Sequence, residues 1–208
     1  MKSAPQRFSN VLKEGITPIL KENGFKKKGQ NYYKSIGEIG QTVNIQKDKW
    51  NSKDEIKFTI NLGIFSEKYW LSEFDFDKTK KIPQLPKESE SIIRKRIGEL
   101  KYGKDFWYSI ESQRLEWKLV KDIKEDFVNY ILPFFKELDT KDKLINHLKS
   151  NQSEYGNDYR LFILLAEEGL KEEAEKVYQK LLENRSEMQI EQIKEKGNKY
   201  NLKNKASM

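Results

Sequence analysis

Two kinds of hydrophobic repeat divide the first two thirds of the chain into helices and strands. In residues 6–23 apolar side chains return every three or four positions, which predicts a helix, and residues 116–137 repeat that spacing. Pro18 and Pro133 fall inside the two patterns. Each is expected to bend or restart its helix, because proline lacks an N–H and clashes with the preceding turn.

Between these helices the pattern changes to alternation. Residues 56–64 alternate without a break between apolar and polar or glycine positions, which is typical of a strand with one buried face. Residues 42–49 alternate in the same way, and the connection between the two strands is short and polar. We therefore expect a hairpin whose polar side chains gather on one face of the sheet: Asn44, Gln46, Thr59 and Asn61.

The stretch NGFKKKGQNYYK, residues 23–34, reads as a turn into a first hairpin. Gly24 suits the left-handed position just past a helix end, and Gly29 suits the turn between two short strands. In a strand, Lys26 and Lys28 share one face while Lys27 lies on the other. The three lysines are therefore expected at the solvated rim of a hairpin, where they can guide an acidic partner.

The stretches RKRIGEL and DFWYSI are expected to be two further extended segments around a glycine turn. In that conformation Arg94 and Arg96 project to the same side, with Lys95 opposite. Arginine binds carboxylate or phosphate through a two-pronged fork, and Trp107 is placed to stack on a guanidinium. The alternative is structural, with the arginines paired to acidic neighbours such as Glu99.

Beyond residue 150 the pattern is that of two antiparallel helices around Gly169, similar to one helix pair of a tetratricopeptide-type repeat. One pair cannot bury its own apolar face, so it should dock on the sheet domain or on a partner. The charged residues from 186 onward are expected to be frayed. The predicted fold is α+β, a mainly antiparallel sheet of about five strands packed by two helices, with domains at 1–149, 150–185 and 186–208.

Charge is distributed unevenly along the 208 residues. The chain carries 40 Lys and Arg against 33 Asp and Glu, a net charge of +7, and residues 1–50 hold 10 basic and 4 acidic residues, a net +6. Such a basic segment attracts phosphate or an acidic partner. The sequence contains no run of about 18 apolar residues, so no membrane span is predicted. The N-terminal residues lack a signal-type apolar stretch and cysteine is absent, so the expected location is cytoplasmic.

The residues that carry catalysis or hold metals in other proteins are sparse here. His147 is the sole histidine, and with no cysteine the usual zinc ligand sets are missing. In EFDFDK, Glu73, Asp75 and Asp77 stand at alternate positions and would share one face if extended, where they could hold a divalent cation. A solvated acidic edge is the simpler interpretation. We predict no catalytic residue, metal or cofactor.

Several stretches occur in the order found in one bacterial family: GFKKKGQNYYK, VNIQK, FTINLGIF, RKRIGEL and DFWYSI. Over residues 5–140 the chain resembles the DUF4304 family, whose function is uncharacterised. The resemblance implies a small α+β domain with an antiparallel sheet. Some relatives are thought to accompany bacterial toxin or competition loci, which implies an immunity role. Many relatives carry a tryptophan pair where this chain has Phe106 and Trp107, and the helices after 150 lie outside the shared domain.

Three functional hypotheses follow. The first is a non-catalytic protein-binding module, in a specific version an immunity- or antitoxin-like protein. The second is a nucleic-acid-binding protein that uses the basic first quarter of the chain. The third is an enzyme using Arg94, Arg96 and a carboxylate, which requires a cleft beside those residues. Partner-binding candidates are Lys26, Lys27, Lys28, Gln46, Asn61, Arg94, Arg96 and Trp107, and no membrane partner is expected.

Overall fold

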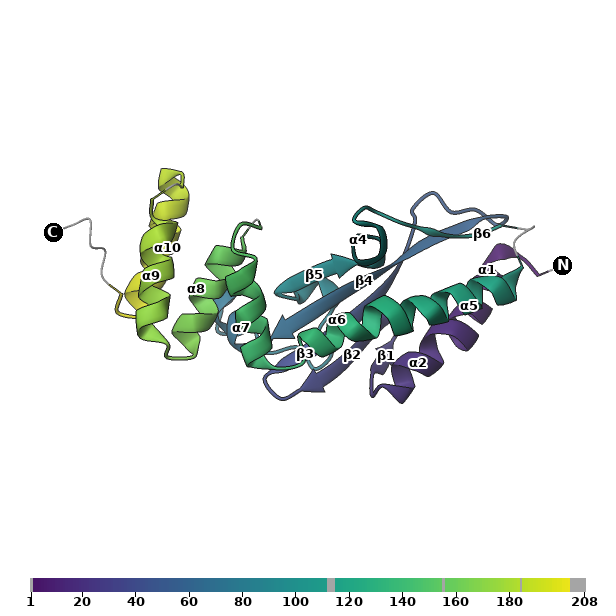
Figure 1. The fold of residues 1–208 in the computed structure, drawn as a ribbon, viewed down its shortest axis with the longest axis horizontal. Helices are drawn as coiled ribbons and strands as arrows, with labels where there is room; N and C mark the ends of the chain where they lie inside the picture. The colour runs from purple at the N-terminus through teal and green to yellow at the C-terminus, as the bar shows by residue number, and fades with distance from the viewer. Residues whose placement is uncertain (1, 112–114, 155, 184, 203–208) are drawn as a thin grey trace. The chain divides into compact units, whose positions relative to one another are not determined.

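The computed structural model describes residues 2–111, 115–154, 156–183 and 185–202 (Figure 1). The chain forms two compact units. The first comprises Met1–Ser66 and Ile82–Asp139, and the second comprises Glu67–Lys81 and Thr140–Met208. Within the described residues, no helix has the length and apolar character needed to cross a membrane.

The first unit is built on one antiparallel sheet, whose six described strands run in the order β1-β2-β3-β4-β5, with β6 also paired to β4. The α+β class and the antiparallel sheet are therefore as predicted. The strands are β1 (Lys26–Lys28), β2 (Asn31–Ile36), β3 (Ile39–Lys47), β4 (Ile56–Ser66), β5 (Ile93–Arg96) and β6 (Tyr108–Ile110).

The apolar face of the sheet is covered by two helical segments that lie along it (Figure 1). They are α1 (Ala4–Val11) with α2 (Thr17–Glu22), and α5 (Glu116–Asp126) with α6 (Leu132–Glu137). Ring contacts mark the core: Phe8 packs edge-on to Phe58 at 5.2 Å between centroids, and Phe25 lies 5.5 Å from Phe135. The buried alternate residues of β4 face these helices, as the alternation predicted.

Each proline stands just after a widened turn of helix. A π-helical turn, η1 (Leu12–Ile16), precedes α2, and another, η3 (Phe127–Ile131), precedes α6. Pro18 and Pro133 are the second residues of the helices that follow. The widened turn relieves the clash of the proline ring with the preceding carbonyl. Both prolines therefore lie within helical runs that continue without a break, and the local irregularity expected at each proline takes the form of a π-helical turn.

The extended interpretation of RKRIGEL is wrong beyond Arg96. Residues Ile97–Tyr102 form helix α4, and only Tyr108–Ile110 of DFWYSI are in a strand. The Glu99 carboxylate accepts a hydrogen bond from the backbone N–H of Arg96, which satisfies a donor at the helix start. This cap, together with the burial of Ile97, turns the chain from strand to helix after four residues.

The second unit is helical. Its helices are α3 (Glu67–Glu73), α7 (Lys141–Ser150), α8 (Asn157–Glu167), α9 (Lys171–Leu181) and α10 (Glu187–Lys199). The predicted pair around Gly169 is α8 and α9. Helix α8 packs against α3, α7 and α9, so five consecutive residues, Leu161–Leu165, are buried. A helix that is apolar on all sides needs such neighbours, and here its own unit supplies them.

The expectation of a frayed tail is wrong for Glu187–Lys199, which form α10. Ile193 is buried, and Gly197 lies directly against the Tyr178 ring of α9. A β-carbon added at Gly197 would stand 2.5 Å from that ring, so glycine is required for the close approach. The sequence signal failed because a glycine in a strongly polar stretch resembles a break in a helix.

Replacing Gly197 by alanine tests this packing by the sign of its effect. In a solvent-exposed helix the change would stabilise by about 1 kcal/mol, because alanine is the better helix former. Against Tyr178 we expect destabilisation by about 1–3 kcal/mol, the usual cost of overpacking. Urea denaturation of the full chain measures the free energy of unfolding. Glu195→Ala, on the exposed side of α10, is the control, and a stabilised Gly197→Ala variant would contradict the contact.

Candidate functional site

One row of polar residues crosses the sheet on the face away from the helices. The strand registers place Lys28 opposite Asn31, Asn31 opposite Asn44, Asn44 opposite Asn61 and Asn61 opposite Arg96. Residues of one row share a face because alternate side chains point to opposite sides of a strand. Asn61 and Arg96, which are 35 positions apart in sequence, thereby become neighbours, and the row as a whole runs from Lys28 to Arg96.

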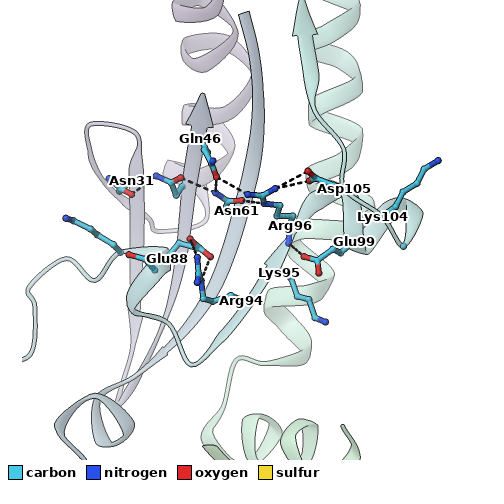
Figure 2. Close-up of a pocket in the computed structure, with 14 residues that line it drawn as sticks. Asn31, Gln46, Asn61, Glu88, Arg94, Lys95, Arg96, Glu99, Lys104 and Asp105 are labelled. Carbon is cyan, nitrogen blue, oxygen red and sulfur yellow. Dashed lines mark hydrogen bonds and ion pairs between the residues drawn. The ribbon is translucent and has the colours of Figure 1, made fainter. Parts of the chain in front are cut away.

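Hydrogen bonds join four amides of this face to Arg96, and we call the five residues Asn31, Asn44, Gln46, Asn61 and Arg96 the amide ladder (Figure 2). Asn44 Nδ2 donates to Asn31 Oδ1 at 2.8 Å, and Asn61 Nδ2 donates to Asn44 Oδ1 at 3.3 Å and Gln46 Oε1 at 2.8 Å. Arg96 Nε donates to Asn61 Oδ1 at 3.1 Å, and its Nη2 donates to Gln46 Oε1 at 3.3 Å. The ladder is thus one connected polar network.

On its other side Arg96 meets a carboxylate and an aromatic ring. Its Nη1 lies 3.1 Å from both carboxylate oxygens of Asp105, and its guanidinium carbon lies 5.6 Å from the Trp107 ring centre. Trp107 Nε1 donates to Asp105 Oδ2 at 2.9 Å. The pKa of Asp105 lies below its ordinary value, mainly because its carboxylate accepts the hydrogen bond from Trp107. Burial opposes this shift, and the hydrogen bond from Arg96 adds to it.

A loop closes down on the same face and supplies a wall. The buried hydroxyls of Thr42 and Ser91 are hydrogen-bonded at 2.9 Å. They meet over Gly63, where a β-carbon would stand 2.3 Å from Ser91 Oγ, so the contact needs a glycine in the strand. The short 3-10 helix η2 (Glu88–Glu90) precedes Ser91. This arrangement holds the Glu88 carboxylate beside the sheet.

Arg94 forms an ion pair with Glu88 of that loop. Its Nε donates to Glu88 Oε1 at 2.7 Å, and its Nη2 donates to Oε2 at 3.3 Å, the two-pronged geometry of a strong ion pair (Figure 2). The hydrogen bond with Glu88 raises the pKa of Arg94, while burial opposes this rise. Both arginines of RKR are therefore already neutralised by carboxylates of their own unit.

A cavity of about 770 Å³ opens over the ladder. Beside it lies a smaller cavity of about 210 Å³, which shares Asn31 and Lys87 with the first and adds Lys26 and Lys28. The larger cavity is lined by Asn31, Asn44, Gln46, Asn61, Lys87, Glu88, Ser89, Arg94, Lys95, Arg96, Glu99, Gly103, Lys104 and Asp105. Together the two cavities are lined by seven basic and three acidic residues, a net charge of +4.

The structure brings most of the candidate residues together. Gln46, Asn61, Arg94 and Arg96 line the larger cavity, Trp107 stacks beside Arg96, and Lys26 and Lys28 line the smaller cavity. Lys27 is separated from them: its Nζ lies 3.3 Å from Thr17 Oγ1 of α2, on the helix-covered side. Glu99 caps α4 through its backbone contact with Arg96, and the side-chain partners of the arginines are Glu88 and Asp105.

Sequence reasoning missed Asn31, Glu88 and Asp105. Asn31 could have been predicted as a residue of the sheet surface, because it begins the second strand of the lysine hairpin and lies two positions before Tyr33, on the same face. Glu88 lies in a 3-10 turn and Asp105 in the connection between α4 and β6, where no periodic pattern marks a position. Their pairing with the arginines depends on tertiary contacts across the unit.

Three lysines of the two cavities differ from the arginines because they are not paired with a carboxylate. Lys26, Lys28 and Lys87 form no ion pair with any residue in the described part of the chain. Lys26 and Lys28 belong to an exposed edge strand. Their ammonium groups leave uncompensated positive charge beside the smaller cavity.

The acidic stretch EFDFDK is not extended, so its predicted shared face does not exist. Glu73 ends α3 and accepts a hydrogen bond from Tyr159, Asp75 pairs with Lys196 at 3.0 Å, and Asp77 accepts from Thr79. Within the described ranges no group of three or more His, Cys, Asp and Glu residues is placed to hold a metal ion. His147 is half-buried in α7.

A family model described as "Domain of unknown function (DUF4304)" matches residues 16–137, more than half of the chain. The match confirms the resemblance seen in the sequence stretches above. No curated protein and no solved structure matches the chain significantly.

The Trp107 indole N–H is expected to report the protonation of Asp105. The pKa of Asp105 is lower in the folded chain than its ordinary value of 3.8. The Arg96–Asp105–Trp107 contact therefore stabilises the fold at pH values above 3.8, and this stabilisation is lost as the pH falls through the lower pKa of the folded chain. In an NMR titration the indole signal should hold steady down to about pH 4 and move only below it. Asp105→Asn should abolish the movement. A midpoint at or above 3.8 in the folded protein would contradict the contact.

Proposed function

The chain belongs to the DUF4304 family, and from that premise we propose that it is a binding module whose polar sheet face receives an acidic segment of a partner protein. The observation that carries the proposal is that the arginines and the lysines of this face differ in whether a carboxylate neutralises them. Both arginines are neutralised internally, while three lysines around the cavities are not. A net charge of +4 around the cavities attracts carboxylates.

The form of the sheet favours binding on the face over pairing at the edge. Edge strand β1 is three residues long and consists entirely of lysine. Short, lysine-rich edge strands discourage the addition of another strand. The open face beside β1 instead offers a hollow lined by amides and lysines. A partner segment seated there is held by side-chain contacts, which supports recognition of a specific acidic sequence.

The specific version of the proposal, an immunity- or antitoxin-like role, rests on the family resemblance. It implies a tight complex of one chain with one partner. The alternative of nucleic-acid binding uses the same lysines and differs in its ligand. The enzyme alternative required a cleft beside Arg94 and Arg96, and the larger cavity meets that requirement. Binding is favoured over catalysis because each guanidinium fork is already occupied by a carboxylate.

Charge reversal at the unpaired lysines tests the proposal. The chain is used to capture a partner from its native host, and the affinity of the purified partner is then measured by calorimetry. Changing Lys26, Lys28 and Lys87 to Glu should weaken binding at least about tenfold, because like charges placed opposite each other cost several kcal/mol. The wild-type affinity should also fall with added salt.

The matched control changes Lys13, Lys21 and Lys124 to Glu, the same change in charge on exposed positions of the helices that cover the other face. It should keep the wild-type affinity. Equal loss in both triple variants would mean that net charge, and not this face, is recognised. Tight binding of an oligonucleotide at about 50 mM salt, in a fluorescence-anisotropy titration, would favour the nucleic-acid alternative instead.

A further inference from the structure

The amide ladder has a direction, and Arg96 sets it. A side-chain amide can turn either its oxygen or its nitrogen toward a neighbour, whereas a guanidinium has donors only. Arg96 donates to Asn61 Oδ1 at 3.1 Å and to Gln46 Oε1 at 3.3 Å. Both amides must therefore turn their oxygens toward the arginine, and the choice between oxygen and nitrogen is fixed at this end of the ladder.

The direction then passes along the row. With its oxygen held by Arg96, Asn61 donates through Nδ2 to Gln46 and Asn44, and Asn44 in turn donates to Asn31 Oδ1 at 2.8 Å. Asn31 Nδ2 and Gln46 Nε2 donate to no residue in the described part of the chain. Every amide oxygen of the ladder already accepts at least one hydrogen bond, whereas the NH₂ groups of Asn31 and Gln46 are left to donate to a ligand.

From this polarity we infer that Asn31 and Gln46 are carboxylate-binding positions, and that they receive two acidic side chains at alternate positions of an extended partner segment. The two residues are diagonal neighbours across β2 and β3, because Asn31 lies opposite Asn44 and Gln46 follows Asn44 by two. Diagonal neighbours on one sheet face are about 7–8 Å apart. Alternate residues of an extended chain are separated by about 7 Å, so the two spacings match.

The surrounding charge agrees with this ligand. Lys28 stands beside Asn31 in the same row, and Lys87 lines both cavities next to it. A carboxylate accepts hydrogen bonds and donates none, which suits a site that presents two amide NH₂ groups with no partner of their own. Arg96 acts as a positioning residue, because its effect on the ligand passes through the amides. The inference rests on the proposed function and adds the pattern that the partner's acidic segment must have.

Two isosteric substitutions remove the donors while keeping the ladder. Asn31→Asp still accepts from Asn44, and Gln46→Glu still accepts from Asn61 and Arg96, but each exchanges an N–H donor for a carboxylate oxygen. The probes are two capped five-residue peptides of identical composition, Gly-Glu-Ser-Glu-Gly and Gly-Glu-Glu-Ser-Gly. Binding to the full chain is followed by NMR, using the side-chain NH₂ signals of Asn31 and Gln46.

The peptide with alternate glutamates should shift both NH₂ signals and bind more tightly than the peptide with adjacent glutamates. Each isosteric variant should weaken its binding at least about fivefold, as expected for a lost hydrogen bond to a charged group. Asn129→Asp, on the exposed side of η3, makes the same change of charge and should leave binding unchanged. Arg96→Lys keeps the charge but not the two-pronged donor, and should reduce the shifts of both NH₂ signals.

The outcomes separate this inference from the proposed function. If Asn31→Asp and Gln46→Glu bind the peptide as the wild type does, while the triple lysine variant no longer binds it, the carboxylate-binding role of Asn31 and Gln46 is overturned. The proposed function, which depends on the lysines, is then supported. If inorganic phosphate shifts the two NH₂ signals and neither peptide does, the assignment to carboxylates is overturned. If the captured partner is unaffected by charge reversal at Lys26, Lys28 and Lys87, the proposed function itself fails.

Discussion

The donor-only guanidinium of Arg96 is the constraint on which the polar side of the sheet depends. Arg96 is the last residue of β5, and its backbone N–H is capped by Glu99 at the start of α4. Its side chain contacts amides of β3 and β4 on one side and Asp105 on the other. One residue therefore ends a strand, begins a helix and orients the hydrogen bonds of its neighbours. A lysine could not do this, because a single ammonium lacks the planar fork that reaches these partners together.

The two faces of the same strands obey opposite requirements. Toward the helices, the alternate residues of β4 from Ile56 to Ile64 are buried and contribute apolar area to the core. On the other face Thr42 and Asn61 are also buried, so their polar groups must be hydrogen-bonded or pay the cost of desolvation. The Thr42–Ser91 contact and the amide ladder meet that need for both. A connected network of this kind restrains its side chains, which keeps the remaining donors of Asn31 and Gln46 in place for a ligand.

Local periodicity explains how much could be predicted from the sequence. Alternation over residues 56–64 placed Asn61 on the polar face, and the spacing of Arg94 and Arg96 placed both guanidiniums on one side. The partners Glu88 and Asp105 lie in irregular segments, where side-chain direction is set by tertiary contacts that no local pattern encodes. Helix α4 was missed because it spans only Ile97–Tyr102, which is too short for a helical repeat to stand out. Helix α10 was missed because Gly197 serves a contact with Tyr178 that is invisible in the sequence.

The matched family region and the compact units do not share boundaries. Residues 67–81 lie within the match over 16–137, yet they belong to the helical unit. There α3 and the turn after it contribute contacts to helices beyond the match: Glu73 accepts from Tyr159, the Ser72 and Tyr200 hydroxyls are 2.7 Å apart, and Lys68 pairs with Glu168. Because α8 is apolar around its circumference, it needs α3 as one of its covers. The packing of the helices after residue 140 therefore depends on α3, which belongs to the family region. A substitution at a contact residue of α3 or of these helices is constrained by the residue on the other side of the contact.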